Sequence, residues 1–484
     1  MSSGIDRRLS TGVAGLDEIL QGGLLAGRSY LVRGPPGAGK TVLGYEFLTA
    51  DPEADALCIN LEESEDDARA NADSLGFDLS NVSFLDLSPE SDFFADDQSY
   101  SVFAPEEVEQ DSLTDQIVDA VRDREPDRVF LDPVTQFRNL TSDEFQFRKQ
   151  VVSFMRFLTE SEATVLFTSQ RTPSTPDDDL QFLSDGIVEL DQTDHGRTIT
   201  VPKFRGSDRR EGTHTFRITG DGMVVFPRLV PDEHGAAVDT EAIGSGLDGL
   251  DSLLGGGIER GTITIVSGPT GVGKTTTATL FAQAAAQRGE RAAIYMFEES
   301  PATFRQRSSA LGIPVEDLEA SEDLHVQEVE PLTRSAEEFA QMVREQVEQR
   351  DTEVVVLDGI NGYKLSIEGD EEPLIRKLHA LGRYLKNMGV TVIFVDEVDT
   401  VTGSFQATNV GISYLADNVL FLRHVELDGR LRKVIGVLKK RVSDFESTLR
   451  EFELAEGEIS VGEPMTDVRG LLRGTPERIG DRGE

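Results

Sequence analysis

Two segments of the chain share one spacing of glycine, lysine and threonine. Each follows an apolar run, precedes a stretch of helical periodicity and fits Gly-x-x-x-x-Gly-Lys-Thr. Glycines at these places let successive backbone N–H groups face phosphate oxygens where a helix begins. The lysine then reaches the β- and γ-phosphates, and the threonine hydroxyl reaches Mg²⁺. The residues of these two predicted nucleotide-binding loops are Gly34, Pro35, Pro36, Gly37, Ala38, Gly39, Lys40 and Thr41, and Gly268, Pro269, Thr270, Gly271, Val272, Gly273, Lys274, Thr275 and Thr276.

An aspartate ends an apolar, strand-like run in each half of the chain. Asp132 closes the run RVFLD, and Asp358 closes the run VVVLD. A carboxylate at the end of a strand beside a phosphate loop is placed to hold Mg²⁺ through water. We therefore expect metal ligands at Thr41 with Asp132, and at Thr275 with Asp358. The alternative is an aspartate that only terminates its strand.

A pair of glutamates follows another apolar run in each half. The pairs are Glu62-Glu63 and Glu298-Glu299. Adjacent residues of an extended segment point to opposite sides, so one carboxylate can face the γ-phosphate while its neighbour orients it. Such a carboxylate can polarise an attacking water or hydroxyl, which makes all four glutamates candidate catalytic residues. In so acidic a chain, the alternative is a solvated start of a helix.

Two pairs of basic residues lie far along the chain from either glycine loop. Lys203 and Arg205, and Lys439 and Arg441, alternate on strand-like stretches, so the two cations of each pair share one face. They are candidate catalytic cations that act across a subunit boundary, as an arginine finger does. The alternative is a charge on an edge strand that pairs with the acidic surface.

These candidates recur in register, which indicates a tandem duplication. We expect a first domain over residues 1–232, a second over 233–464 and a charged tail over 465–484. Apolar runs of strand length alternate with amphipathic stretches such as 106–125 and 144–162. This pattern is typical of a parallel sheet covered on both faces. The predicted fold class is therefore α/β, with two tandem domains.

Composition narrows the setting of the protein. The chain has 484 residues with 88 acidic and 47 basic side chains, a formal net charge of −41, and 10 Lys against 37 Arg. An acidic, lysine-poor surface suits molar salt, where charges on one surface barely repel, so we hypothesise a halophilic host. The same acidity disfavours a standing complex with nucleic acid. One cysteine, Cys58, and no apolar run of bilayer length lead us to expect a cytoplasmic protein without membrane contact.

The chain resembles the KaiC family of RecA-like ATPases over nearly its whole length. The resemblance is carried by the leaders GLDEILQGGL and GLDSLLGGGI, both glycine loops, NLEES and MFEES, the strand-end aspartates, KFRGS, KKRVS and the closing LLRGTPERI. It implies two RecA-like domains per chain, a double ring of six chains and ATP with Mg²⁺ between neighbouring subunits. One chain would supply the loop, metal ligands and glutamates, and its neighbour the basic pairs.

The resemblance also implies ATP hydrolysis and phosphorylation of the second domain on adjacent serine and threonine residues. Here Ser413 matches the family's serine, Tyr414 replaces the threonine, and Thr408 falls on another hydroxyl of the same loop. A two-site phosphorylation cycle is therefore not expected, whereas Ser413 and Thr408 stay candidate acceptors. The alternative is that Ser413 only introduces the following strand.

Three classes of function compete. The leading one is an oligomeric, regulatory ATPase with Ser/Thr autokinase activity. The second is a DNA-associated motor or recombinase, but the segments 169–186 and 397–417, expected to face a channel, hold one basic residue, Arg171. The third is a nucleotide-dependent scaffold without turnover that binds a signalling protein such as a sensor kinase.

Overall fold

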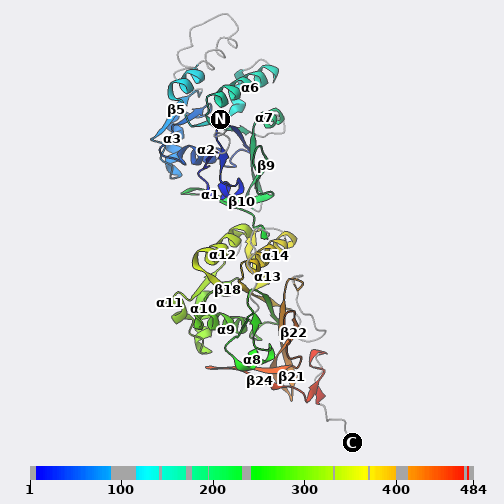
Figure 1. Cartoon of the computed structure of the whole chain (residues 1–484). Coiled ribbons are helices and arrows are strands. Elements are labelled where there is room, and N and C mark those ends of the chain that lie inside the picture. Colours follow the sequence, from blue (N-terminus) through cyan, green and yellow to red (C-terminus); the bar gives the residue numbers. More distant parts are fainter. Residues whose placement is uncertain are drawn as a thin grey trace, which may run out of the picture. The chain divides into compact units, whose positions relative to one another are not determined.

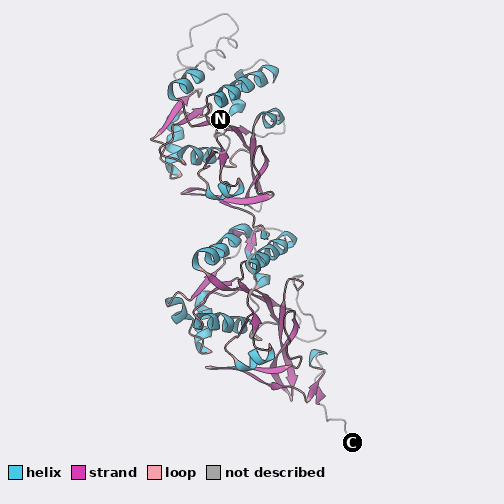
Figure 2. Cartoon of the chain, viewed as in Figure 1, coloured by secondary structure: helices cyan, strands magenta, loops and turns pink. Residues whose placement is uncertain are grey.

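The computed structural model describes residues 7–88, 116–140, 144–170, 177–193, 196–231, 241–330, 333–368, 371–398, 413–473 and 477–478. The chain divides into two compact units, Met1–Arg228 and Leu229–Glu484. Within the described residues, each unit holds one nine-stranded sheet with helices packed on it (Figures 1 and 2). The predicted fold class is confirmed: each unit is RecA-like, with a mainly parallel sheet flanked by helices.

The sheet of the first unit has the strand order β11-β10-β9-β8-β3-β7-β6-β4-β5. Neighbours from β8 to β5 run parallel, whereas β9, β10 and β11 extend the sheet as antiparallel strands. The strands are β3 (Ser29–Gly34), β4 (Ala56–Asn60), β5 (Val82–Asp86), β6 (Arg128–Asp132), β7 (Thr164–Gln170), β8 (Gly186–Thr193), β9 (Gly196–Phe204), β10 (Thr213–Thr219) and β11 (Gly222–Phe226), beside the short pair β1 (Arg8–Leu9) and β2 (Leu24–Leu25). The helices are α1 (Ala14–Ile19), α2 (Lys40–Thr49), α3 (Glu65–Ser74), residues 116–124, the 3₁₀ helix η1 (Val134–Leu140), α6 (Glu144–Glu160) and α7 (Asp178–Leu183).

The second unit repeats this arrangement with the order β16-β15-β18-β20-β14-β21-β22-β23-β24. Its central strand β14 again lies between two parallel neighbours, β20 and β21. The strands are β14 (Ile263–Gly268), β15 (Arg291–Met296), β16 (Leu324–Glu328), β18 (Thr352–Asp358), β20 (Thr391–Glu397), β21 (Asn418–Leu427), β22 (Arg430–Lys440), β23 (Arg450–Ala455) and β24 (Glu458–Pro464), with the short pairs β12 (Ala242–Ile243) and β13 (Ile258–Glu259), β17 (Arg334–Ser335) and β19 (Ile367–Glu368), and β25 (Val468–Arg469) and β26 (Glu477–Arg478). The helices are α8 (Asp248–Leu253), α9 (Lys274–Gln287), α10 (Pro301–Ala310), α11 (Val315–Ala320), α12 (Ala336–Arg350), α13 (Ile360–Ser366), α14 (Glu371–Asn387) and the 3₁₀ helix η3 (Leu471–Arg473).

The central strands are apolar on both faces, which explains why helices cover the sheet on both sides. In β3, Tyr30 and Val32 belong to one core cluster and Leu31 to another, because successive side chains point to opposite faces. Helix α2 contributes Phe47 to the first cluster, and α6 contributes Phe147 to the second. No helix within the described residues combines the length and apolar character that crossing a bilayer requires.

Part of the segment expected to be a charged tail packs against the second unit. Val468 and Leu471 are buried in one cluster with Val425 and Val434 of β21 and β22. A guanidinium of β21, Arg423, donates a hydrogen bond of 2.8 Å to the main-chain carbonyl of residue 472. The residues after Met465 therefore add apolar contacts to strands β21 and β22.

Candidate functional site

Each glycine loop connects the end of the central strand to the first residue of a helix. Strand β3 ends at Gly34 and α2 begins at Lys40, and β14 and α9 repeat this arrangement. Gly37 has φ 75° and Gly39 has φ 100°, a left-handed backbone that favours glycine. At Gly39, a Cβ atom would lie 2.7 Å from a side-chain carbon of Ile218. The loop therefore needs glycine for its backbone conformation, and a side chain at residue 39 would also displace the end of Ile218.

Other loop residues anchor the turn. Ala38 and Val272 are fully buried in the core clusters, and Thr276 is buried on the first turn of α9. The main-chain carbonyl of Thr270 lies 3.4 Å from Nε2 of His424 on β21. The apolar residues fix the loop, which leaves the lysine and the following threonine to meet a ligand.

The loop lysine of the first unit is held close to the backbone of its own loop. Lys40 is 8% exposed, and its Nζ donates to the carbonyls of Gly34 at 3.1 Å and Pro35 at 3.0 Å. Burial lowers the pKa of Lys40, and the charges of Asp132 and Glu62 oppose this shift. The ammonium group is thus placed at the start of α2, where phosphate oxygens bind.

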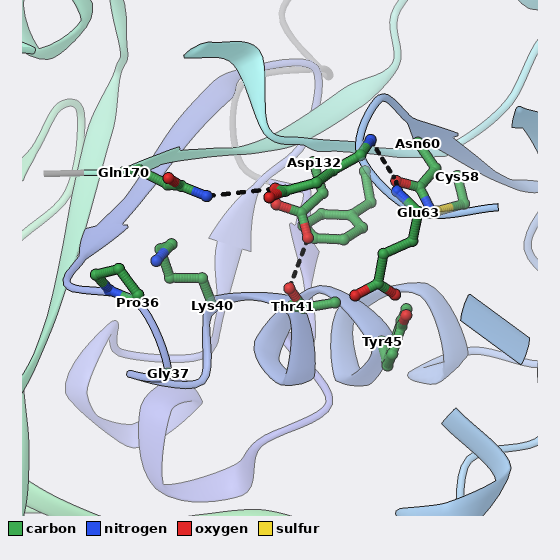
Figure 3. Close-up of a pocket in the computed structure, with 12 residues that line it drawn as sticks. Pro36, Gly37, Lys40, Thr41, Tyr45, Cys58, Asn60, Glu63, Asp132 and Gln170 are labelled. Carbon is green, nitrogen blue, oxygen red and sulfur yellow. Dashed lines mark hydrogen bonds between the residues drawn. The ribbon is translucent and has the colours of Figure 1, made fainter. Parts of the chain in front are cut away.

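The predicted metal ligands of the first unit lie in contact. Thr41 Oγ1 donates to Asp132 Oδ2 at 2.6 Å (Figure 3). Thr168 of the neighbouring strand β7 donates to Asp132 Oδ1. Burial raises the pKa of Asp132, whereas the hydrogen bonds from both threonines and the charge of Lys40 lower it. A hydroxyl and a carboxylate are the oxygen ligands that Mg²⁺ prefers, so this donor set fits Mg²⁺.

Both glutamates of the first unit line a pocket of about 160 Å³ beside the loop (Figure 3). The backbone N–H groups of Glu62 and Glu63 both lie 3.3 Å from Asn60 Oδ1, which fixes the turn after β4. Glu62 Oε2 accepts from Gln170 Nε2 at 3.3 Å, and Glu63 Oε2 accepts from Asn71 Nδ2 at 3.1 Å. The pair therefore faces the same space as Lys40 and Thr41, which also line the pocket.

The second unit brings the same residue types together with different partners. Thr275 Oγ1 donates to Asp358 Oδ1 at 3.0 Å, and burial raises the pKa of Asp358 to about 6 against the effect of that hydrogen bond. Lys274 Nζ donates to the carbonyl of Pro269 at 2.9 Å and also forms an ion pair of 3.1 Å with Glu397 Oε2.

The glutamates of the second unit differ from those of the first. Glu298 Oε1 accepts from the N–H of Gly362 in α13 at 3.0 Å. Glu299 pairs with Arg307 of α10 at 2.8 Å. The carboxylate of Glu298 therefore contacts α13, whereas that of the adjacent Glu299 contacts α10.

Four polar residues at these sites escaped prediction from the sequence. Asn60, Thr168, Gln170 and Glu397 lie on or at the ends of strands next to the loop or to β6. Each is a single polar residue without a spacing pattern. The signal that could have identified them is their place at the carboxyl ends of the apolar runs ALCIN, TVLFTSQ and TVIFVDE.

The structure does not bring the first basic pair to the loop of its own unit. The N–H of Arg205 donates to the carbonyl of Asp185, whose own N–H donates to the carbonyl of Ser29 at the start of β3. The loop begins at the other end of β3, at Gly34, about 16 Å away at 3.3 Å per residue. Lys203 Nζ donates to a main-chain carbonyl of α7 at 2.5 Å, so it too is directed away from the loop.

The second basic pair contacts the segment that carries the candidate acceptor. Lys439 Nζ lies 3.3 Å from the carbonyl of Ser413, and Arg441 donates to the carbonyl of Tyr414 at 3.2 Å. Ser413 itself is exposed. Thr408 lies outside the described residues. The acceptor candidate and the cations are therefore neighbours, on the segment that leads into β21.

The fold and the paired glycine loops define the class of the protein: it is a tandem RecA-like ATPase with two nucleotide-binding loops. A family model described as "ATPase: KaiC" matches residues 9–230 and again 243–466. The chain belongs to this KaiC ATPase family.

Several relatives match nearly full length. The chain is 28% identical over 494 residues to the circadian clock oscillator protein KaiC of Picosynechococcus sp., with 98% of this chain and 93% of the relative covered. It is 28% identical to the circadian clock protein KaiC3 of Synechocystis sp., with 98% and 95% covered. It is also 28% identical to the KaiC of Thermostichus vulcanus, with 99% and 93% covered.

Proposed function

We propose that this protein hydrolyses ATP at two sites per chain, and that each site is completed by basic residues of a neighbouring copy. The observation that carries the proposal is the separation of Arg205 from Gly34 along β3. A cation at one end of the sheet and a phosphate loop at the other cannot meet within one unit, so we assign the cation to the site of a neighbouring copy.

In the first site, Lys40 neutralises the β- and γ-phosphates, and the N–H groups at the start of α2 bind their oxygens. Thr41 and Asp132 would hold Mg²⁺, which would supply positive charge beside the phosphates. Glu62 orients the attacking water and takes up its proton, while Gln170 and Asn60 hold the glutamate segment in place. Lys274, Thr275, Asp358 and Glu298 have the corresponding roles in the second site.

The arrangement between copies is head-to-tail, because the loop of one copy meets the basic pair of the next. A head-to-tail contact closes into a ring when the rotation allows it. We propose a ring of six copies, which the family resemblance implies. The relatives are named as clock proteins, and we propose for this chain a regulatory role exercised through a signalling partner such as a sensor kinase.

The second site is also proposed to phosphorylate the chain itself. The segment of Ser413 leads into Asp417, whose N–H donates to the carbonyl of Ile263 at the start of β14, whereas the loop begins at the other end of β14, at Gly268. We therefore propose that the phosphoryl group comes from the site of the adjacent copy. Incubation with ATP and Mg²⁺ followed by phosphopeptide mapping should find phosphate on Ser413 or Thr408. A chain without phosphate on either residue would exclude the autokinase activity.

The main proposal is tested by measuring size and phosphate release together in molar KCl. With ATP and Mg²⁺, the chain of 53.0 kDa should form an assembly of about six copies. Phosphate release should be steady and should fall at least about a hundredfold in Glu62→Gln with Glu298→Gln. Glu456→Gln, an exposed carboxylate on a turn, is the matched control and should leave the rate unchanged. A monomer that releases no phosphate would reject the proposal.

A further inference from the structure

The two nucleotide sites differ at one equivalent position beside the loop. In the first unit, Gly34 pairs in register with Gln170, the last residue of β7. In the second unit, Gly268 pairs in register with Glu397, the last residue of β20. The strand next to the loop therefore ends in a neutral amide in one site and in a carboxylate in the other.

This difference changes the partner of the loop lysine. In the first site, Gln170 donates a hydrogen bond to Glu62. Lys40 Nζ donates to the main-chain carbonyls of Gly34 and Pro35 in its own loop. Glu397 instead forms an ion pair of 3.1 Å with Lys274, which is 8% exposed, while Glu397 is 34% exposed. Hydrogen bonds between ionised groups in partly buried positions are among the stronger ones in proteins.

A phosphate that approaches Lys274 meets two obstacles that the first site lacks. The ammonium group must give up Glu397 before it binds phosphate oxygens, and the displaced carboxylate stays within the site. The second site then holds an additional negative charge beside Glu298, Glu299 and Asp358, and like charges repel a triphosphate. The last residue of β20 is also fixed in place, because Asn361 of α13 donates to its main-chain carbonyl at 3.1 Å.

We propose that Glu397 sets the nucleotide affinity of the second site by competing with phosphate for Lys274, so that the first site fills at lower ATP concentration. The inference rests on the proposed assignment of both loops as nucleotide sites. It makes Glu397 an affinity-determining residue, whereas the residue at the equivalent position of the first unit, Gln170, carries no charge. Removal of its charge should free Lys274 and tighten binding, the opposite of the usual effect of breaking an ion pair.

The test measures binding of the non-hydrolysable analogue adenylyl-imidodiphosphate with Mg²⁺ to the full chain by calorimetry. Lys40→Ala silences the first site, and Glu397→Gln in that background should bind the analogue about tenfold more tightly. Lys274→Ala silences the second site, and Gln170→Glu in that background should bind the analogue several-fold more weakly. Glu456→Gln in the Lys40→Ala background controls for the loss of one charge from an acidic chain and should leave affinity unchanged.

Each outcome decides the inference. The inference is overturned if Glu397→Gln in the Lys40→Ala background leaves the affinity for the analogue unchanged or lowers it. It is also overturned if the analogue binds neither to the Lys40→Ala chain nor to the chain with both substitutions. Tighter binding, or binding gained only in Glu397→Gln, supports it. A thermal melt of each variant tests whether the ion pair of Lys274 with Glu397 only stabilises the fold. In that case, Glu397→Gln would lower the melting temperature without tightening the binding of the analogue. A chain that binds the analogue at both sites but never releases phosphate from ATP contradicts the proposed hydrolysis and leaves this inference intact.

Discussion

Replacing Lys203 and Arg205 with alanine in one population of chains, and Glu62 with glutamine in another, separates the two parts of the first nucleotide site. Both populations also carry Glu298→Gln, so that phosphate release reports on the first site alone. Neither change touches the loop, so nucleotide binding and assembly are expected to persist. Each population alone is expected to be inactive: the loss of the cations should slow hydrolysis about a thousandfold, and the loss of the carboxylate at least about a hundredfold.

The expected result of mixing follows from the geometry. Arg205 is level with Ser29, and β3 then runs about 16 Å to the loop. In the proposed arrangement, each active site therefore combines Glu62 of one copy with the cations of another. In an equal mixture of freely exchanging chains, about one interface in four combines an intact Glu62 with intact cations. We therefore expect the mixture to regain about a quarter of the activity of chains that carry only Glu298→Gln.

The assay is phosphate release from the mixture after subunit exchange, with native mass spectrometry to verify mixed assemblies. Rings cross-linked before mixing provide the control and should show no gain. Mixed assemblies without a gain in activity would refute the argument. Full activity of the chain that lacks both cations would refute it as well, because the site would then be complete within one copy.

Three further predictions concern the metal site, the packing of the loop helix and the acidic surface. Burial raises the pKa of Asp358 to about 6, so its carboxyl becomes protonated as the pH falls below 6. The Mg²⁺ affinity of the second site, measured in a Lys40→Ala chain, should then drop about tenfold per pH unit. An affinity that stays constant from about pH 7.5 to 5 would contradict this prediction. Gly44→Ala places a Cβ atom 2.1 Å from the ring of Phe130 and should lower the free energy of unfolding by about 1–3 kcal/mol in a denaturant titration, whereas Gly220→Ala, with no atom within 4 Å, should change it by less than about 0.5 kcal/mol. With a net charge of −41, the chain should melt at a higher temperature in molar KCl than in dilute buffer, since 1 M salt shortens the Debye length to about 3 Å, and equal melting temperatures would reject the halophilic hypothesis.

The parallel part of each sheet could be predicted because its signals are local. Strands β3, β6 and β7 each contain three consecutive apolar residues, and a glycine loop follows β3 directly. The contact of Thr41 with Asp132 could also be anticipated, because strands β3 and β6 end at the same edge of a parallel sheet. Local pattern and strand polarity were sufficient for these features.

Other parts of the site depend on tertiary structure. Nothing in the spacing of Gln170 or Glu397 connects either residue to a glycine loop more than 100 residues away, and only the strand order makes them neighbours. The antiparallel strands β10, β23 and β24 lack a near-continuous apolar pattern, because polar and partly exposed residues alternate with the apolar ones. The contact of Lys439 with the segment of Ser413 likewise depends on the pairing of β22 with β21.

The separation of Arg205 from Gly34 along β3 has a consequence for how such an enzyme responds to its own abundance. If each site is completed by a neighbouring copy, as proposed, a solitary copy carries two incomplete sites. The rate per molecule should then fall steeply when the protein is diluted below the concentration at which neighbours associate. ATP hydrolysis would then begin only above a threshold concentration of the protein in the cell.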